Sequence, residues 1–197
     1  MRLANTENGG IEMTRNQKGF TLVEIAIVLV IIGLLIGGVL KGQSMIQNAK
    51  VKRVVKSADE VRAAFYTFYD KYGVYPGDEN LASSPPNDGN NGNGNGLIDG
   101  AEYYQMFEDL VNAGIIDGTF NGTSDLPKHA FGGTYMVYWT NPGSGANHYI
   151  RYGNLPWDVA LEIDTKYDDG VYNTGTIRAN EDYTPAGSPV AYFYLPL

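Results

Sequence analysis

The fold of this chain is decided by residues 20–40, FTLVEIAIVLVIIGLLIGGVL, which contain a single ionisable side chain, Glu24. As an α-helix this segment would be about 31 Å long, at ~1.5 Å per residue, close to the hydrocarbon thickness of a bilayer. The chain as a whole nevertheless has the composition of a soluble acidic domain, with 197 residues, 18% of them charged, and a net charge of −8. The sequence therefore predicts two unlike parts, and the roughly 157 residues after the apolar segment are enough for one compact domain.

The charges are distributed unevenly along the chain. Residues 57–197 carry 6 basic and 19 acidic side chains, whereas the stretch just after the apolar segment is purely basic (Lys41, Lys50, Lys52, Arg53 and Lys56). Such a basic collar favours anionic lipid headgroups or acidic neighbours, or else it is a solvated helix face. The acidic balance excludes a general nucleic-acid binder, and we find no dedicated nucleic-acid motif. The lack of cysteine excludes disulfides and thiol chemistry.

The apolar segment has three possible interpretations. A secretory signal peptide has a shorter apolar core and a small-residue cleavage site behind it, and this segment has neither. A plain membrane anchor explains the length but not Glu24, because a carboxylate inside an apolar span is expensive and marks a functional partner. The third interpretation is a segment that serves first as a membrane anchor and later as a packing surface.

The residues around the start of the segment favour the third interpretation. Lys18-Gly19-Phe20-Thr21-Leu22-Val23-Glu24 resembles the class III leader of type IV pilins and type II secretion pseudopilins. The resemblance implies that a prepilin peptidase cuts between Gly19 and Phe20 and methylates the new amino terminus. Residues 1–19 are then a leader peptide, with Met13 as an alternative start to Met1, and residues 20–40 are the transmembrane and filament-core part.

The resemblance also implies partners and a role for Glu24. The chain would form a helical homopolymer on an inner-membrane assembly platform, leaving the membrane as it assembles. In that family the buried acid pairs with the free amine of the neighbouring subunit, which here is the amine of Phe20. Such a pair would set the axial register of the subunits.

A helical apolar stripe continues beyond the membrane segment. It comprises Val51, Val54, Ala58, Val61, Phe65, Phe68 and Tyr72, at alternating spacings of 3 and 4 residues. We expect one long helix whose second part, residues 41–73, docks a head domain through this stripe; a coiled-coil seam is the alternative. Gly73 and Pro76 predict its end.

The head, residues 74–197, begins with an Asn- and Gly-rich loop at 87–102. Within it, residues 91–102 follow the register of an EF-hand calcium loop, with glycine at the sixth position. The predicted calcium ligands are Asn91, Asn93, Asn95, Asp99, Glu102 and the carbonyl of Leu97. Asn91 replaces the usual aspartate and Pro85-Pro86 excludes an entering helix, so we expect weak binding, with a disordered or hydrogen-bonded turn as the alternative.

A second acidic group, Asp164, Asp168 and Asp169, follows a helical stretch at 156–163. Asp164 and Asp168 would share a helix face and repel one another. Their repulsion calls for a cation, for Lys166 or for a nearby helix terminus. The group is therefore either a helix end with a turn at Gly170 or a second metal site.

Three β-rich stretches, residues 134–140, 148–152 and 191–195, predict a small antiparallel sheet. Packed on the long helix, it gives an α+β architecture, which the resemblance identifies as the pilin fold. No catalytic constellation is present around the two histidines, so we expect no enzyme. The predicted function is a structural pilus subunit, first in the inner membrane and then extracellular. The alternatives are a periplasmic secretion pseudopilin and a minor tip subunit with a calcium-dependent binding site.

Overall fold

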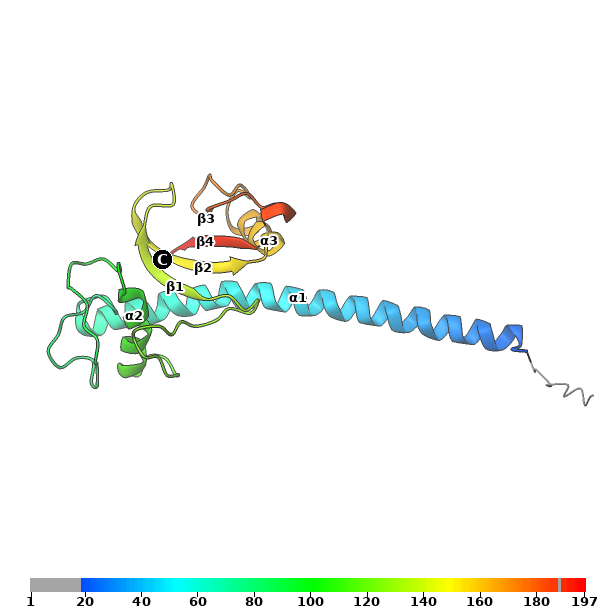
Figure 1. Cartoon of the computed structure of the whole chain (residues 1–197), viewed down its shortest axis with the longest axis horizontal. Coiled ribbons are helices and arrows are strands. Elements are labelled where there is room, and N and C mark those ends of the chain that lie inside the picture. Colours follow the sequence, from blue (N-terminus) through cyan, green and yellow to red (C-terminus); the bar gives the residue numbers. More distant parts are fainter. Residues whose placement is uncertain (1–18, 188) are drawn as a thin grey trace, which may run out of the picture. The chain divides into compact units, whose positions relative to one another are not determined.

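The computed structural model describes residues 19–187 and 189–197. The chain divides into a first unit that ends at Ser44 and a head unit, Met45–Leu197. Helix α1, Leu22–Tyr72, belongs to both units and is followed in the head by α2, Glu102–Asn112, and α3, Trp157–Tyr167 (Figure 1). The predicted α+β architecture is confirmed.

The head contains one antiparallel sheet. Its spatial order is β1-β2-β4-β3, formed by β1, Tyr135–Thr140, β2, Asn147–Leu155, β4, Val190–Pro196, and the short edge strand β3, Arg178–Ala179. The first three strands were predicted with nearly these bounds, whereas β3 was not. A two-residue strand between turns leaves no alternation of side chains to detect.

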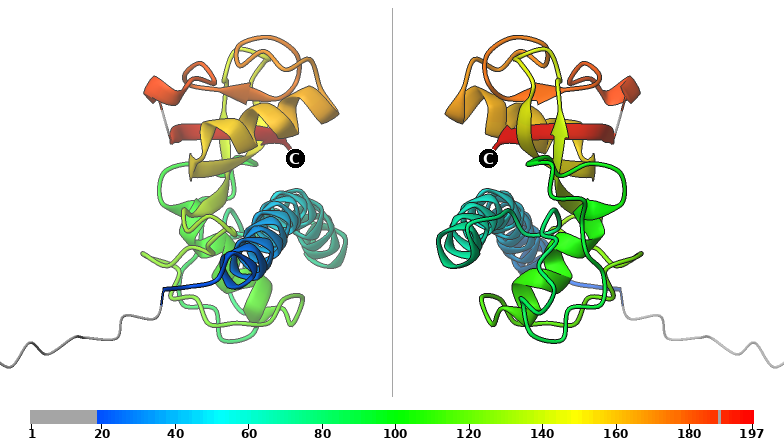
Figure 2. Two further views of the ribbon diagram at one scale, coloured as in Figure 1. Left: turned by 90° about the vertical axis from the view of Figure 1, so that its right-hand side faces the viewer. Right: turned by 90° about the vertical axis from the view of Figure 1, so that its left-hand side faces the viewer.

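The core of the head forms between the sheet and one face of α1. The predicted stripe is buried from Val51 to Phe68, and Phe65 and Phe68 are completely inaccessible to solvent. Each such aromatic side chain stabilises the packing by about 1.5–3 kcal/mol. Figure 2 shows the sheet on one side of this part of α1, with α3 alongside β4. The stripe therefore packs against the sheet of the same chain rather than forming a coiled-coil seam.

One polar residue joins this core against expectation. Ser57 lies off the predicted stripe in sequence but is buried, and its Oγ donates to the carbonyl of Val54 at 2.6 Å and lies 2.8 Å from Tyr152 Oη. Tyr152 also donates to the Val54 carbonyl at 3.1 Å. The pair ties β2 to α1 through hydrogen bonds inside an apolar layer.

The end of α1 follows the sequence signals. Gly73 has a φ of +75° and its N–H donates to the Tyr69 carbonyl at 2.7 Å, which is the left-handed helix ending that glycine favours. The chain then passes through Pro76 and Gly77 into the loops at 78–101, which precede α2.

Candidate functional site

The first turn of α1 is capped by the side chains of Thr21 and Glu24. Glu24 Oε2 accepts hydrogen bonds from Thr21 N at 2.7 Å and Thr21 Oγ1 at 2.8 Å, and Thr21 Oγ1 accepts from Glu24 N at 3.2 Å. This is a capping box, which satisfies free N–H groups of the first helical turn. The Thr21-x-x-Glu24 spacing is visible in the sequence, so this second role of Glu24 was open to prediction and was missed.

The capping box uses one of the two carboxylate oxygens. Both hydrogen bonds from Thr21 end on Oε2, and in the described part of the chain Oε1 has no donor. The side chain is also exposed. Glu24 is therefore held in position while one oxygen is available to a further donor.

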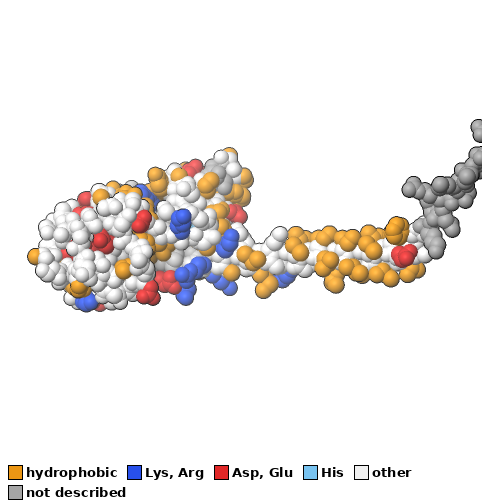
Figure 3. Space-filling model, turned by 60° about the horizontal axis from the view of Figure 1, so that its bottom comes forward, with side chains coloured by type: hydrophobic (Ala, Val, Ile, Leu, Met, Phe, Trp, Pro, Cys, Tyr) orange, Lys and Arg blue, Asp and Glu red, His pale blue; other side chains and the backbone are white. Residues whose placement is uncertain are grey.

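The apolar side chains that follow have no cover within the described chain. Every residue of α1 up to Leu40 is exposed, with Leu22 90% and Leu34 78% accessible. Figure 3 shows these apolar side chains along the first part of α1. Keeping each one in water costs about 1.5–3 kcal/mol relative to an apolar environment. A window of this helix with a mean hydropathy of 2.9 is long and apolar enough to cross a membrane.

The predicted cleavage position lies at the edge of the described chain. Gly19 and Phe20 precede the helix and are exposed, Phe20 to 84%. A Cβ at Gly19 would meet no atom within 4 Å. Lys18, Met13 and the rest of the predicted leader lie outside the described residues.

The predicted calcium loop is organised around the carboxylate of Glu102. This buried side chain accepts from Asn93 N through Oε1 and from Asp99 N through Oε2, both at 3.0 Å. The amide oxygens of Asn93 and Asn95 accept from the backbone two residues further on, Asn95 N at 3.0 Å and Leu97 N at 2.8 Å. Burial raises the pKa of Glu102. The loop thus has the turn hydrogen bonds of the alternative interpretation, built on the residues predicted as ligands.

Asp78, which sequence reasoning did not assign to the loop, supports it from outside. The side chain is 3% exposed, and its two oxygens accept from Asn95 N at 2.9 Å and Gly96 N at 2.7 Å. The two backbone segments also form a hydrogen bond with one another, since Gly94 N donates to the Asp78 carbonyl at 2.9 Å. Two adjacent acids after a Pro-Gly turn were the available sequence signal.

Asn91 lies beside a different group of acids. With its amide oriented to donate, Nδ2 is 3.1 Å from Glu79 Oε1 and 3.2 Å from Asp88 Oδ2. Glu79, Asp88 and Asp109, called here the Glu79 cluster, each place an oxygen within 4.8 Å of the others. The first of the predicted calcium ligands is therefore in contact with acids that were not predicted to form a site.

The Glu79 cluster is strongly destabilised as a set of charges. Glu79 and Asp109 are completely buried, and burial raises the pKa of Glu79 to about 7 and that of Asp109 to about 8. Neighbouring carboxylates add to both shifts. Asp109 lies on α2, whereas Glu79 and Asp88 lie in the loops before it, so no sequence spacing could have indicated the cluster.

The three predicted acids near the end of α3, called here the Asp164 cluster, also come together, with oxygens within 4.8 Å. Asp164 is buried and accepts from Gly170 N at 3.2 Å and Tyr183 Oη at 2.6 Å. Asp168 accepts from Thr176 N and Ile177 N, and Asp169 from Val171 N and Thr174 Oγ1. Backbone and hydroxyl donors, rather than Lys166 or a helix terminus, compensate the charges.

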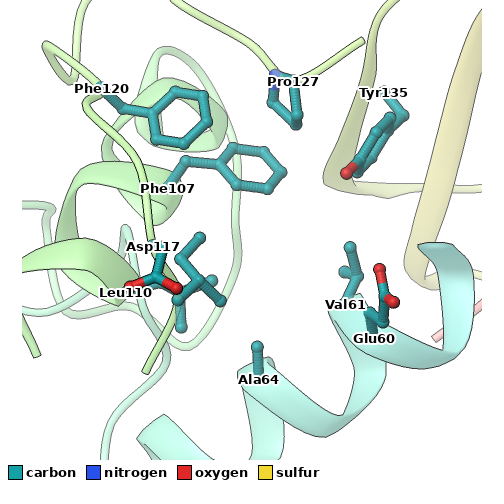
Figure 4. A pocket seen from close by; sticks show the side chains of 10 residues that line it. Glu60, Val61, Ala64, Phe107, Leu110, Asp117, Phe120, Pro127 and Tyr135 are labelled. Atoms are coloured by element: carbon teal, nitrogen blue, oxygen red, sulfur yellow. The ribbon is translucent and has the colours of Figure 1, made fainter. Parts of the chain in front are cut away.

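An apolar pocket of about 230 Å³ opens in the head between α1 and α2. Figure 4 shows Phe107 and Phe120 facing it from one side and Val61 and Ala64 from α1, with the carboxylates of Glu60 and Asp117 at its edges. Nothing in the lining converges on a point as a catalytic or ligand-binding group would. We interpret the pocket as a gap in the packing of the loop at 114–127 against α1.

The two histidines have structural partners. His148 Nε2 accepts from Ile98 N at 3.0 Å, which links the loop at 91–102 to β2. His129 Nε2 lies 2.9 Å from the carbonyl oxygen of Gly153, and His129 Nδ1 accepts from Phe131 N at 3.3 Å. Burial lowers the pKa of both, which favours the neutral form that these hydrogen bonds need.

Comparison with known proteins identifies the N-terminal segment. Residues 14–40 match the family model described as the prokaryotic N-terminal methylation motif. This class III prepilin leader is typical of type IV pilins and pseudopilins, so the predicted resemblance is confirmed over this segment. The motif supports a type IV pilin-like or pseudopilin-like precursor, and it implies processing by a prepilin peptidase. No curated protein and no solved structure matches the chain.

Proposed function

We propose that this chain is the structural, non-enzymatic subunit of a type IV pilus filament. The observation that carries the proposal is the exposed apolar part of α1, which lies within the segment that matches the methylation motif and has the capped Glu24 in its first turn. The peptidase would cut between Gly19 and Phe20 and methylate Phe20. The apolar part would then move from the inner membrane into the filament core, where neighbouring subunits replace lipid as its cover.

The proposed function gives Glu24 an intermolecular partner. In a filament core, a buried carboxylate costs several kcal/mol unless it is paired. The free Oε1 of Glu24 would accept from the amine of Phe20 in the neighbouring subunit, while Oε2 keeps its bonds to Thr21. The pair would fix the axial register with which subunits join.

Substitutions at the capping box separate the two roles of Glu24. Glu24→Gln retains the cap, because glutamine serves in capping boxes as well, but it removes the charge. We expect normal processing and helix content with little or no filament, since breaking a buried ion pair costs about 3–5 kcal/mol. The measurement is the yield of filaments sheared from cells, with mass spectrometry of the subunit to show cleavage and methylation.

Thr21→Ala is the matched control. It removes the hydroxyl of the capping box at a cost of about 0.5–2 kcal/mol to the helix but leaves the charge of Glu24. This variant should still assemble. Normal filaments from Glu24→Gln would overturn the pairing, because the cap alone would then explain why Glu24 stands in the first turn.

The motif is equally typical of pseudopilins, and the same preparation separates the two classes. A pilus subunit is recovered as long filaments from the cell surface. A secretion pseudopilin stays in the periplasm in short filaments and is released only when the outer membrane is broken. A minor tip subunit would be found at low abundance in surface filaments built from another chain.

We also propose that the loop at 91–102 binds calcium and stiffens the head. Support comes from the EF-hand register and from the buried carboxylate of Glu102, which already orders the loop through Asn93 and Asp99. Only two of the predicted ligands are charged, so the affinity should be weak, about 10⁻⁴–10⁻³ M as in extracellular modules. Glu102→Gln is included in the calcium titrations described below.

A further inference from the structure

The Glu79 cluster joins three segments of the head. Glu79 follows the turn after α1, Asp88 lies in the next loop, and Asp109 is on α2. One oxygen of each lies within 4.8 Å of the others. Glu79 and Asp109 have no solvent-accessible surface, while Asp88 is half-buried and forms the side nearest to solvent.

One oxygen of the cluster has no hydrogen-bond donor. Asp109 Oδ2 accepts from Gly77 N at 2.5 Å, but Oδ1 is fully buried and has no partner among the described residues. An unsatisfied buried carboxylate oxygen is costly, and protein structures rarely keep one without a ligand or another function. Asp109 therefore carries a buried oxygen without a donor, and one of its two carboxylate oxygens lies within 4.8 Å of oxygens of Glu79 and Asp88.

Basic side chains do not compensate the cluster. In the described part of the chain, the ion pairs join Arg53 and Lys56 to Glu60 and Arg62 to Asp59, all on α1. The charged groups outside the cluster that raise the pKa values of its members are further acids: Glu108 acts on Asp109, and Asp78 acts on Glu79. When they are ionised, three carboxylates in this position need a positive charge, and the ion pairs among the described residues do not supply one.

The donor set selects the kind of cation. All candidate ligands are oxygen atoms: the carboxylates of Glu79, Asp88 and Asp109, and the amide oxygen of Asn91 in the orientation in which it, rather than the amide nitrogen, faces Glu79 and Asp88. Oxygen donors without nitrogen or sulfur select a hard cation. Several carboxylates on flexible loops, able to bind through one or two oxygens, suit calcium better than magnesium, which requires near-octahedral geometry and retains water.

We propose that Glu79, Asp88 and Asp109, with Asn91 at the start of the loop, bind a calcium ion at a second site, distinct from the one predicted around Glu102. The ion would cross-link α2 to the two loops that precede it. Asp78 and Glu79 are adjacent in sequence but contact different groups. The Asp78 carboxylate accepts from Asn95 N and Gly96 N in the loop, whereas the Glu79 carboxylate belongs to the second site. Calcium at this site therefore stabilises the surface from which the loop projects.

The test is a calcium titration of the full chain in detergent micelles after removal of metal with EGTA. Binding is followed by calorimetry, and the unfolding midpoint by the fluorescence of Trp139 and Trp157, both in the head. Glu102→Gln removes the loop site, so calcium that this variant still binds belongs to the second site. Adding Asp109→Asn to Glu102→Gln should abolish that binding, or weaken it by roughly tenfold or more.

Asp109→Asn has a second expected signature. Asparagine keeps an oxygen for Gly77 N but cannot ionise, so above about pH 8, where Asp109 carries its buried charge, the variant should melt at a higher temperature than the wild type in EGTA and gain less from calcium. A side chain with only a structural role would melt lower in both conditions. If Asp109→Asn does not fold, Asp88→Asn, at the half-buried edge of the site, takes its place in the test.

Three outcomes overturn the proposal. The first is that Glu102→Gln binds no calcium. The second is that the double variant binds calcium as tightly as Glu102→Gln alone. The third is that magnesium at equal concentration binds with the same affinity as calcium. Asp164→Asn is the matched control in the other acidic cluster and should leave the calcium response unchanged. Because the readout is binding and unfolding, failure of this proposal leaves the filament proposal untouched, and the reverse also holds.

Discussion

The head contains two clusters of three acids that look alike in composition and in the spacing of their oxygens, yet they differ in how those oxygens are satisfied. In the Asp164 cluster, every carboxylate accepts two hydrogen bonds from the loop at 168–177 or from Tyr183. In the Glu79 cluster, the fully buried Asp109 has an oxygen without a donor. Proximity of acids is therefore a poor sign of a metal site, and an unsatisfied buried oxygen is a better one.

The chain around each cluster explains the difference. Asp168 and Asp169 follow α3 directly, and the chain turns back so that Thr176 N and Ile177 N point at Asp168. Gly175 is required there, because a Cβ would overlap the Asp168 carboxylate. The acids of the Glu79 cluster come from three separate segments, and each accepts one nearby backbone N–H, from Leu81, Asn90 and Gly77 respectively. No donor of these segments reaches Asp109 Oδ1.

The largest effect is expected from breaking the Asp164 cluster. Asp164→Ala leaves Gly170 N and the buried hydroxyl of Tyr183 without a partner, and should lower the free energy of unfolding by about 2–4 kcal/mol. Urea unfolding of the full chain in detergent, followed by tryptophan fluorescence, measures this. Saturating calcium should not restore the loss; if it does, the Asp164 cluster also binds a cation and the contrast with the Glu79 cluster is wrong.

A smaller effect is expected from a glycine that lets the Glu79 cluster form. A Cβ at Gly92 would overlap the Gly77 carbonyl and the backbone of Asp78, and Gly92 N donates to the Glu79 carbonyl at 2.7 Å. Gly92→Ala should therefore separate the two loops, cost about 1–3 kcal/mol, and weaken the calcium response by moving Glu79 away from Asp109.

Gly89→Ala is the control in the same loop. A Cβ at Gly89 would meet only Glu108 Oε1, at an ordinary 3.8 Å, so the change should stay within about 0.5 kcal/mol. Equal losses in the two variants would show that loop flexibility, rather than the close approach of the two backbones, determines stability here.

Sequence reasoning succeeded where one continuous stretch carries the information. The apolar segment, the stripe from Val51 to Phe68 and the three long strands all depend on local periodicity, and all are found close to the predicted positions. The docking of the stripe against the head also follows from its spacing, because one helix face can be apolar only if something covers it. The capping box of Thr21 and Glu24 belongs to the same class of local signals, although it was overlooked.

Reasoning from sequence failed where the site is assembled from distant residues. Asp109 lies on α2 and is separated by more than one loop from Glu79, and only the folded head shows that they meet. The EF-hand register drew attention to Asn91 as a loop ligand, but its side chain is turned to Glu79 and Asp88. Ser57 was not included in the predicted stripe, yet it is buried, and Tyr152 provides the hydrogen-bond partner that allows its burial.

The smallest expected effect is a pH dependence in the Asp164 cluster. Burial raises the pKa of Asp164 above its ordinary value, although Tyr183 Oη and Gly170 N partly oppose the shift. The folded state thus holds this proton more tightly than the unfolded state, and the associated stability is present below about pH 3.9 and is lost as the pH rises through the folded pKa. Asp164→Asn cannot titrate, and its amide oxygen can still accept from Gly170 N.

The stability of Asp164→Asn relative to wild type should therefore increase between pH 3.5 and pH 7, while remaining within about 1 kcal/mol. Urea unfolding at several pH values in EGTA measures the difference, in which titrations common to both proteins cancel. A difference that does not change with pH would mean that the hydrogen bonds to Asp164 fully offset its burial. The acids of the Asp164 cluster would then be better satisfied than their burial implies, and the contrast with Asp109, whose Oδ1 has no donor, would be sharper still.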